Sequence, residues 1–236
     1  MCVPPNVQEH TVPAQATSPS GPATSTSRTA APSGRERLLR AALKLSAQRR
    51  SIANIGLREL AREAGLHHTA IYRHFKSVDD VATTLVHTLS SQLRADLRRT
   101  RRAAVEDGQD MIRASTQRYF DYVLQHPQGV IFCAREVHGA LPTLRQALQA
   151  MLDDFAMDSA DDLAELTPEL ELPDRETVLV LTRLIAEHTL YAAMDYLEHP
   201  GQRAQIVNRA TLFSEWLIAG ASRPAAAPTP RSKPAG

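Results

Sequence analysis

The 236-residue chain has few of the features that mark secreted, disulfide-bonded or membrane-spanning proteins. Its two cysteines, Cys2 and Cys133, form no disulfide framework and fit reduced thiols. No apolar run approaches the roughly 18 residues that a membrane span needs. The N-terminus also has no charged-then-apolar signal for secretion. We therefore expect a cytoplasmic protein that makes no membrane contact.

Aromatic residues, glycine and proline are also scarce in the middle of the chain. Aromatic residues make up 5% of the sequence, there are 10 glycines, and most of the 15 prolines lie near the two ends. The middle is instead rich in Ala, Leu and Arg, which favour helices. No segment has a clear strand pattern, so we predict an all-α fold.

The two ends of the chain are poor in large apolar residues. Residues 1–33 consist largely of Pro, Ser, Thr and Ala, and residues 221–236 have a similar composition. Such segments bury too little apolar surface to offset the entropy lost on ordering. We predict that both ends are disordered and that residues 34–80 and 81–220 form two folded domains.

Charge is distributed unevenly, although the formal net charge is only +1. Residues 35–76 carry ten Lys or Arg against three acidic residues, whereas residues 103–220 carry eight Lys or Arg and 19 acidic residues. A basic small unit beside an acidic larger one indicates a polyanion contact at one end. A solvated basic face would give the same count, so the choice depends on the motif within the segment.

That motif is "AREAGLHHTAIYRHFK", residues 61–76. A short helix after Gly56 ends at Gly65, where a positive φ is needed, and a second helix runs from about His68 to Phe75. A helix, a glycine turn and a helix are typical of a helix-turn-helix motif, whose second helix enters the major groove. Small or hydrogen-bonding side chains at its start suit base edges, and the basic and hydroxyl groups that follow suit phosphates. The predicted DNA-binding residues are Arg35, Gly56, Arg58, His67, His68, Thr69, Ala70, Tyr72, Arg73, His74 and Lys76.

Helical spacing of apolar residues predicts the other elements. A first helix begins after the N-cap Ser33 and ends near Arg49, and a fourth begins after Ser77, where Asp80 completes a pattern like a capping box. We expect the far end of this helix, "RADLRRTRR", to be basic and solvated. Five more helices are predicted at about residues 108–125, 128–139, 142–165, 174–198 and 201–219.

The alternative of a helical enzyme with a site in the acidic body lacks a catalytic motif. His67 and His68 are adjacent, so they cannot share one helix face. No H-E-x-x-H, Cys-x-x-Cys or glycine-rich phosphate loop is present. Glu187 and His188 could form a metal pair, but a lone His in an apolar helix is more often a satisfied core group. We therefore expect no enzyme activity, no metal and no cofactor.

The segment "SGRERLLRAALKLSAQRR…IGLRELAREAGLHHTAIYRHFKSVDDV" resembles the DNA-binding domain of the TetR-family transcriptional regulators over about residues 34–81. This resemblance implies an all-helical homodimer with a three-helix DNA-binding head and a body that binds a small-molecule effector. "LSAQRR", "LRELAREAG", "IYRHF" and "VDDV" further resemble the repressors of unsaturated fatty-acid synthesis, the FabR and DesT type. That branch implies a long-chain acyl thioester as effector. The alternative within the family is a regulator of efflux or catabolic genes that answers another apolar compound.

The body contains several aromatic or soft residues at helical spacing that could line an effector cavity or form a packed core. Arg135 could pair with an acidic residue of the body or clamp an anionic effector headgroup. Cys133 is predicted to be a small buried hydrophobic residue. The candidate ligand-binding residues are Phe120, Phe132, Arg135, Phe155, Tyr191 and Met194.

The last two predicted helices carry more apolar surface than one face against the core requires. They contain "VLVLTRLIAEHTLYAAMDYL" and "IVNRATLFSEWLIAG". Pairing these helices with those of a second copy would bury the excess in a four-helix interface. The sequence thus predicts a homodimer that binds a double-stranded DNA operator.

Overall fold

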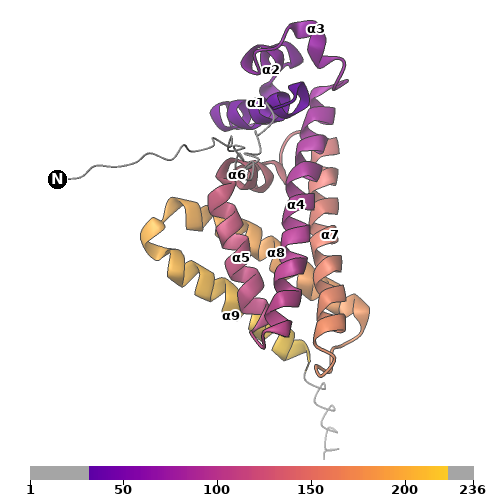
Figure 1. Cartoon of the computed structure of the whole chain (residues 1–236), viewed down its shortest axis with the longest axis vertical. Coiled ribbons are helices and arrows are strands. Elements are labelled where there is room, and N and C mark those ends of the chain that lie inside the picture. The colour runs from indigo at the N-terminus through magenta and orange to yellow at the C-terminus, as the bar shows by residue number, and fades with distance from the viewer. Residues whose placement is uncertain (1–31, 223–236) are drawn as a thin grey trace, which may run out of the picture. The chain divides into compact units, whose positions relative to one another are not determined.

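The computed structural model of the chain describes residues 32–222, so most of the two segments predicted to be disordered lies outside the described residues. Within residues 32–222 the chain is helical and has no strand, which confirms the all-α prediction (Figure 1). Two short 3-10 helices, η1 (Ile52–Asn54) and η2 (Pro200–Gln202), join longer elements. The α-helices are α1 (Gly34–Arg49), α2 (Leu57–Glu63), α3 (His68–Ile71), α4 (Val78–Glu106), α5 (Met111–Gln125), α6 (Pro127–Glu136), α7 (Pro142–Leu166), α8 (Arg175–Glu198) and α9 (Arg203–Ala221).

We call residues 34–77, which hold α1 to α3, the head, and residues 78–222 the body. Apolar side chains from all three head helices are fully buried and hold the head together: Leu38, Ala42, Leu60 and Ile71 are 0% exposed. The predicted domain boundary at residue 80 falls within the first turn of α4, because this helix already begins at Val78.

The helix starts follow from their capping residues. Ser33 caps α1 as predicted, since its hydroxyl accepts a hydrogen bond from the Glu36 N–H at 3.3 Å, and the Glu36 carboxylate accepts one from the Ser33 N–H at 2.7 Å. Ser77 likewise caps α4 by accepting from the Asp80 N–H at 3.1 Å. The predicted capping-box pattern is wrong in one detail: Asp80 accepts from the Lys76 N–H at 3.0 Å. Ser77 is fully extended, which places the Lys76 N–H within reach of Asp80.

The third helix is shorter than predicted. Regular α-helix ends at Ile71, and the predicted continuation to Phe75 is a turn. The N–H groups of His74 and Phe75 both donate to the Ile71 carbonyl, at 2.9 Å each. These converging bonds tighten the last turn in the 3-10 manner and return the buried Phe75 to the head core.

The remaining helices lie close to their predicted positions, with two shifts at their ends. Helix α5 begins at Met111 rather than 108, because Asp110 caps it by accepting from the Arg113 N–H at 2.8 Å. Helix α6 ends at Glu136 rather than 139, where the Gly139 N–H donates to the Glu136 carbonyl at 2.8 Å and closes a turn.

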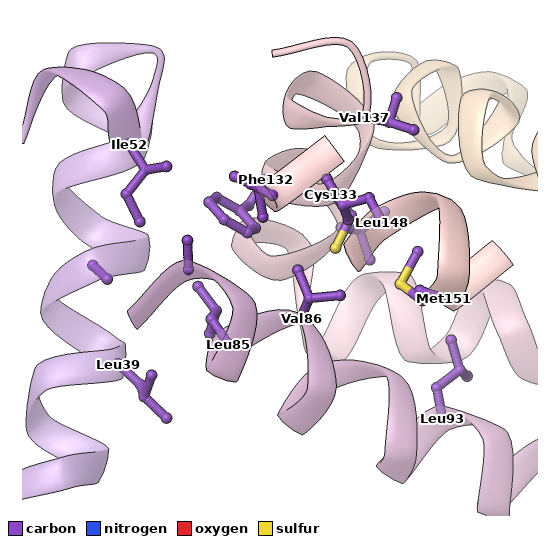
Figure 2. Packing of buried hydrophobic residues seen from close by; sticks show 14 of the residues in the cluster. Leu39, Ile52, Leu85, Val86, Leu93, Phe132, Cys133, Val137, Leu148 and Met151 are labelled. Atoms are coloured by element: carbon purple, nitrogen blue, oxygen red, sulfur yellow. The ribbon is translucent and has the colours of Figure 1, made fainter. Parts of the chain in front are cut away.

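Head and body share one continuous apolar core. The buried cluster runs from Leu39 and Ile52 of the head through Leu85 of α4 and Phe132 of α6 to Met151 of α7 (Figure 2). Because interiors are close-packed, displacement of one element in such a cluster is transmitted to its neighbours. The body therefore holds the head directly, through α6 as well as through α4.

The far end of α4 is not solvated as predicted. Helices α4 and α7 lie side by side (Figure 1), and the arginines of α4 pair with acidic residues of α7. Arg94 contacts Asp154 and Asp158 at 2.6 Å each. Arg101 and Asp162, both buried, are 2.6 Å apart. We call this row of ion pairs, which Arg98 with Asp162 and Arg102 with Glu165 complete, the ionic seam.

One acidic side chain of the seam, that of Asp158, is held in its charged form. Burial raises the pKa of Asp158, but the Arg94 hydrogen bond and the nearby arginine charges outweigh it and hold the pKa below its usual range. The prediction failed because the acidic partners of these arginines lie about sixty residues farther along the chain. The local sequence around the arginines gives no sign of them. Within residues 32–222, no helix is both long and apolar enough to cross a membrane.

Candidate nucleic-acid interface and ligand cavity

The turn between α2 and α3 is fixed by a glycine and an arginine. Gly65 has a φ of +63°, the left-handed conformation that was predicted for it. Arg37 of α1 donates to the carbonyls of Ala64 and Gly65 at 2.5 and 2.9 Å, which satisfies the end of α2. A Cβ at residue 65 would lie 2.9 Å from that guanidinium group. The backbone angle therefore favours glycine, and a Cβ would also force the Arg37 guanidinium group to shift.

The start of α3 presents polar side chains to solvent. His67, His68 and Thr69 are exposed, and Ala70 is half-buried. His67 occupies the N-cap position, but its side chain does not cap the helix. Its Nδ1 instead lies 2.9 Å from the Thr69 hydroxyl oxygen, and its ring lies 4.4 Å from that of His68. The three side chains thus form an exposed, mutually oriented group at the N-terminus of the helix.

The other predicted DNA-binding residues are also exposed. Tyr72 is 57% exposed, although its neighbour Ile71 is completely buried. Arg35 lies over the ring of Phe75 at 5.5 Å. Gly56 occupies the N-cap of α2 and has open space around it. The remaining exposed residues of this set are Arg58, Arg73, His74 and Lys76.

Much of the positive charge of the head is free of ion pairs within residues 32–222. Lys44 pairs with Glu63 at 2.5 Å, and Arg49 pairs with Glu59 at 3.0 Å. These two bridges consume both acidic residues of α2. The cations that form no salt bridge with another described residue include Arg35, Arg40, Arg58, Arg62, Arg73 and Lys76. This charge is available to an external polyanion.

The body contains a cavity of about 140 Å³ between α4, α5, α6, α7 and α8. Its walls are mainly carbon, from residues such as Leu93, Leu97 and Val130. Gly129 lets α6 approach α4, since a Cβ there would lie 2.9 Å from Leu89. The apolar character of this space is typical of a site for a small apolar molecule.

Of the six residues predicted to bind a ligand, Phe155 lines this cavity, and the structure places the other five elsewhere. Phe120 is fully buried against Tyr196, with their ring centroids 4.6 Å apart. Phe132 and Arg135 lie on the side of α6 that faces α1. Two residues of α8 complete the set: Tyr191 is exposed with its hydroxyl oxygen 2.9 Å from His138 Nε2, and Met194 is half-buried.

Three residues that line the cavity carry polar groups and were not among the predicted ligand-binding residues: Tyr119, Tyr122 and Cys133. The Tyr119 hydroxyl is buried and has no hydrogen-bond partner among the described residues. The Tyr122 hydroxyl donates to the Leu89 carbonyl at 3.1 Å. Cys133 is buried as predicted and lies on the cavity wall. Burial raises the pKa of Cys133 and of Tyr122 to about 12 and raises that of Tyr119 further, so all three groups stay protonated near neutral pH.

His188 departs from its prediction as a satisfied core group. Its Nε2 atom is buried without a hydrogen-bond partner in the described part of the chain, and its ring packs on Phe213 at 4.1 Å. Burial, with a smaller effect of Arg209, lowers the pKa of this imidazole. It is therefore a neutral, unsatisfied group between α8 and α9.

Residues 38–83 match the sequence model of a family described as "Bacterial regulatory proteins, tetR family". Over these residues the chain is therefore similar to the tetR family. This match spans all of α2 and α3 and most of α1, together with the start of α4. The tetR-type motif thus coincides with the exposed helix-turn-helix described above.

Several solved structures share the fold of the chain. A Syntrophomonas wolfei chain assigned to the TetR-family transcriptional regulators has a TM-score of 0.65 at 12% identity, covering 79% of this chain and 95% of that one. The fatty acid degradation regulator FadR from Bacillus halodurans has a TM-score of 0.60 at 13% identity, covering 80% and 97%. Regulatory protein TetR from Rhodobacter sphaeroides has a TM-score of 0.59 at 19% identity, covering 77% and 97%. At 12 to 19% identity, these likenesses show that the chain shares their fold.

Proposed function

We propose that this protein is a dimeric TetR-type repressor that binds a palindromic DNA operator through α2, α3 and the residues around them. The observation that carries the proposal is the exposed group of His67, His68 and Thr69 at the start of α3. Side chains at this position of a helix-turn-helix motif contact base edges in the major groove. The cations without ion pairs, among them Arg73 and Lys76, supply phosphate contacts.

The proposed dimer forms through α8 and α9. Val180, Leu184 and Tyr191 recur along one face of α8 and are 56, 44 and 47% exposed. Trp216 of α9 is 71% exposed. Large apolar side chains gathered in this way mark an interaction surface, and a two-fold axis would place the same helices of a second copy against it.

We predict that Leu184→Asp converts the dimer to monomer, because it places a charge at the centre of that surface. Sedimentation at micromolar protein concentration measures the change. Leu124→Asp on α5, where the leucine is 42% exposed, is the matched control and should leave the dimer intact. A wild-type monomer, or equal effects of the two variants, would refute the interface.

Helix α6 offers a physical link from cavity to head. Gly129, Val130 and Cys133 line the cavity, while Glu136 of the same helix is buried against the head. The Glu136 carboxylate accepts a hydrogen bond from the Ile52 N–H at 2.8 Å. A ligand that enlarges the cavity would displace α6 and, through this bond, the head. It changes operator affinity only if it binds the two arrangements unequally.

We propose an apolar effector for the cavity. The resemblance to the repressors of unsaturated fatty-acid synthesis favours a long-chain acyl thioester, and the apolar walls suit an acyl chain. The volume favours the alternative, a smaller apolar compound that controls efflux or catabolic genes. About 140 Å³ is below the roughly 300–1,000 Å³ of typical ligand pockets, so an acyl chain would have to widen the cavity.

Operator titration by fluorescence anisotropy tests this function, with and without palmitoyl- and oleoyl-thioesters below their micellar concentrations. If acyl thioesters are the effectors, operator affinity should change by a coupling of about 1–3 kcal/mol, and the two chains should differ. Identical curves with and without both thioesters would refute the fatty-acid role and favour the smaller effector. Binding that shows no preference for any duplex would refute the repressor itself.

A further inference from the structure

The Tyr119 hydroxyl differs from most other hydroxyl groups around the cavity. Those of Ser115, Thr116 and Thr182 donate to carbonyls of their own helices, at 2.7 to 2.9 Å. The Tyr119 hydroxyl, by contrast, is buried and donates to no described group. A buried donor without an acceptor is unfavourable and rare in folded proteins, so its presence requires an explanation.

The charge around the cavity restricts what could satisfy this hydroxyl. Among the residues that line the cavity, Arg101 is the charged one, and it is engaged by the buried Asp162 at 2.6 Å. An anionic ligand would have to compete with Asp162 for that guanidinium group, between walls that are mainly carbon. The walls therefore favour a ligand without charge.

We infer that the cavity takes a small, uncharged, mainly apolar molecule whose carbonyl oxygen accepts the hydrogen of the Tyr119 hydroxyl. A ketone, an aldehyde or an ester has the required acceptor on an apolar frame. The hydroxyl suits this role because burial raises its pKa and keeps it protonated near neutral pH. The inference rests on the proposed function only in taking this cavity as the effector site.

Three compounds of similar size separate the effects of a hydrogen-bond acceptor and of a charge on binding. Acetophenone supplies a carbonyl acceptor, ethylbenzene supplies none, and benzoate supplies a charge. Calorimetric titration of the full chain measures their affinities. The wild-type protein should bind acetophenone roughly fivefold more tightly than ethylbenzene, as expected for one net hydrogen bond. Benzoate should bind more weakly than both.

Tyr119→Phe removes the hydroxyl and keeps the ring, so acetophenone and ethylbenzene should then bind equally. Its midpoint of thermal unfolding should not fall, because no hydrogen bond is lost. Tyr122→Phe is the matched control. The Tyr122 hydroxyl donates to Leu89, so its loss should leave the preference for acetophenone unchanged.

Three results would overturn the inference: no binding of acetophenone, a preference that survives in Tyr119→Phe, or benzoate binding as tightly as acetophenone. Operator titration with saturating acetophenone then tests the proposed function separately. If the Tyr119-dependent preference is observed but DNA affinity does not change, the ligand class is right and the cavity is not the effector site.

Discussion

Arginine is abundant in two regions of this chain, the head and the distal half of α4, where it has different partners. In the head, Arg58, Arg73 and other cations are exposed and form no salt bridge with a described residue. In α4, Arg94 and Arg101 are bound by acidic residues of α7. The comparison shows that the density of positive charge does not identify a polyanion site. Charge that no internal ion pair neutralises is the better indication of such a site.

The difference has a geometric cause. In α2, Glu59 and Glu63 are spaced to meet two cations of α1, and the other head cations form no salt bridge with a described residue. In α7, four acidic residues recur every three or four positions: Asp154, Asp158, Asp162 and Glu165. This spacing places them along one face of a helix, opposite the arginines of α4.

The largest expected effect is on the ionic seam. Asp162→Asn should lower the free energy of unfolding by about 3–5 kcal/mol, because it leaves Arg101 buried without a counter-charge. Denaturant unfolding at fixed protein concentration measures this. The control, Glu165→Gln, removes the exposed partner of Arg102 and should cost less than about 1 kcal/mol. Equal losses in the two variants would mean that burial does not distinguish these pairs.

A smaller effect is expected at the start of α3. If Thr69 contacts a base edge as proposed, Thr69→Ala should reduce discrimination at one operator base pair by about 1–3 kcal/mol, because the variant lacks the exposed hydroxyl. Competition between operators that differ at single positions measures the change. The control is Ser91→Ala, which removes an exposed hydroxyl from α4. A uniform loss on every sequence would show that Thr69 contacts the DNA backbone instead.

The smallest effect is expected when a single cation is removed. It tests most directly whether the unpaired cations of the head and the paired cations of the seam differ in DNA binding. Lys76→Ala should weaken binding to all duplexes and reduce the slope of log affinity against log salt by about one unit. Arg102→Ala should change neither quantity, because that charge already pairs with Glu165 at 2.9 Å. If both variants reduced the slope equally, the seam would also contribute to DNA binding.

Local chemistry made the head predictable from sequence. The cap at Ser33, the glycine at residue 65 and the spacing of Leu60 and Ile71 each depend on neighbours within a few residues. The full length of α3 was not predictable in this way, because the packing of Phe75 against the head core tightens its end.

The helices of the body were predictable from the sequence, but the residues that line its cavity were not. Periodicity shows that Phe120 and Phe155 lie on buried faces, but it cannot show which face packs tightly and which borders a cavity. Tyr119 and Arg101 carry no local signal at all. Their roles depend on helices α7 and α8, whose positions follow from the packing of the whole body.

The hydrogen bond from the Ile52 N–H to Glu136, together with the packing of Phe132 beside it, matters when the head is fused to another body. A chimera that joined this head to a foreign body at residue 80 would remove both contacts, although the sequence suggests a clean break there. The exchangeable unit is the head plus the surface of α6 that it rests on. Engineers who transplant the head should carry Phe132 and Glu136 into the recipient helix.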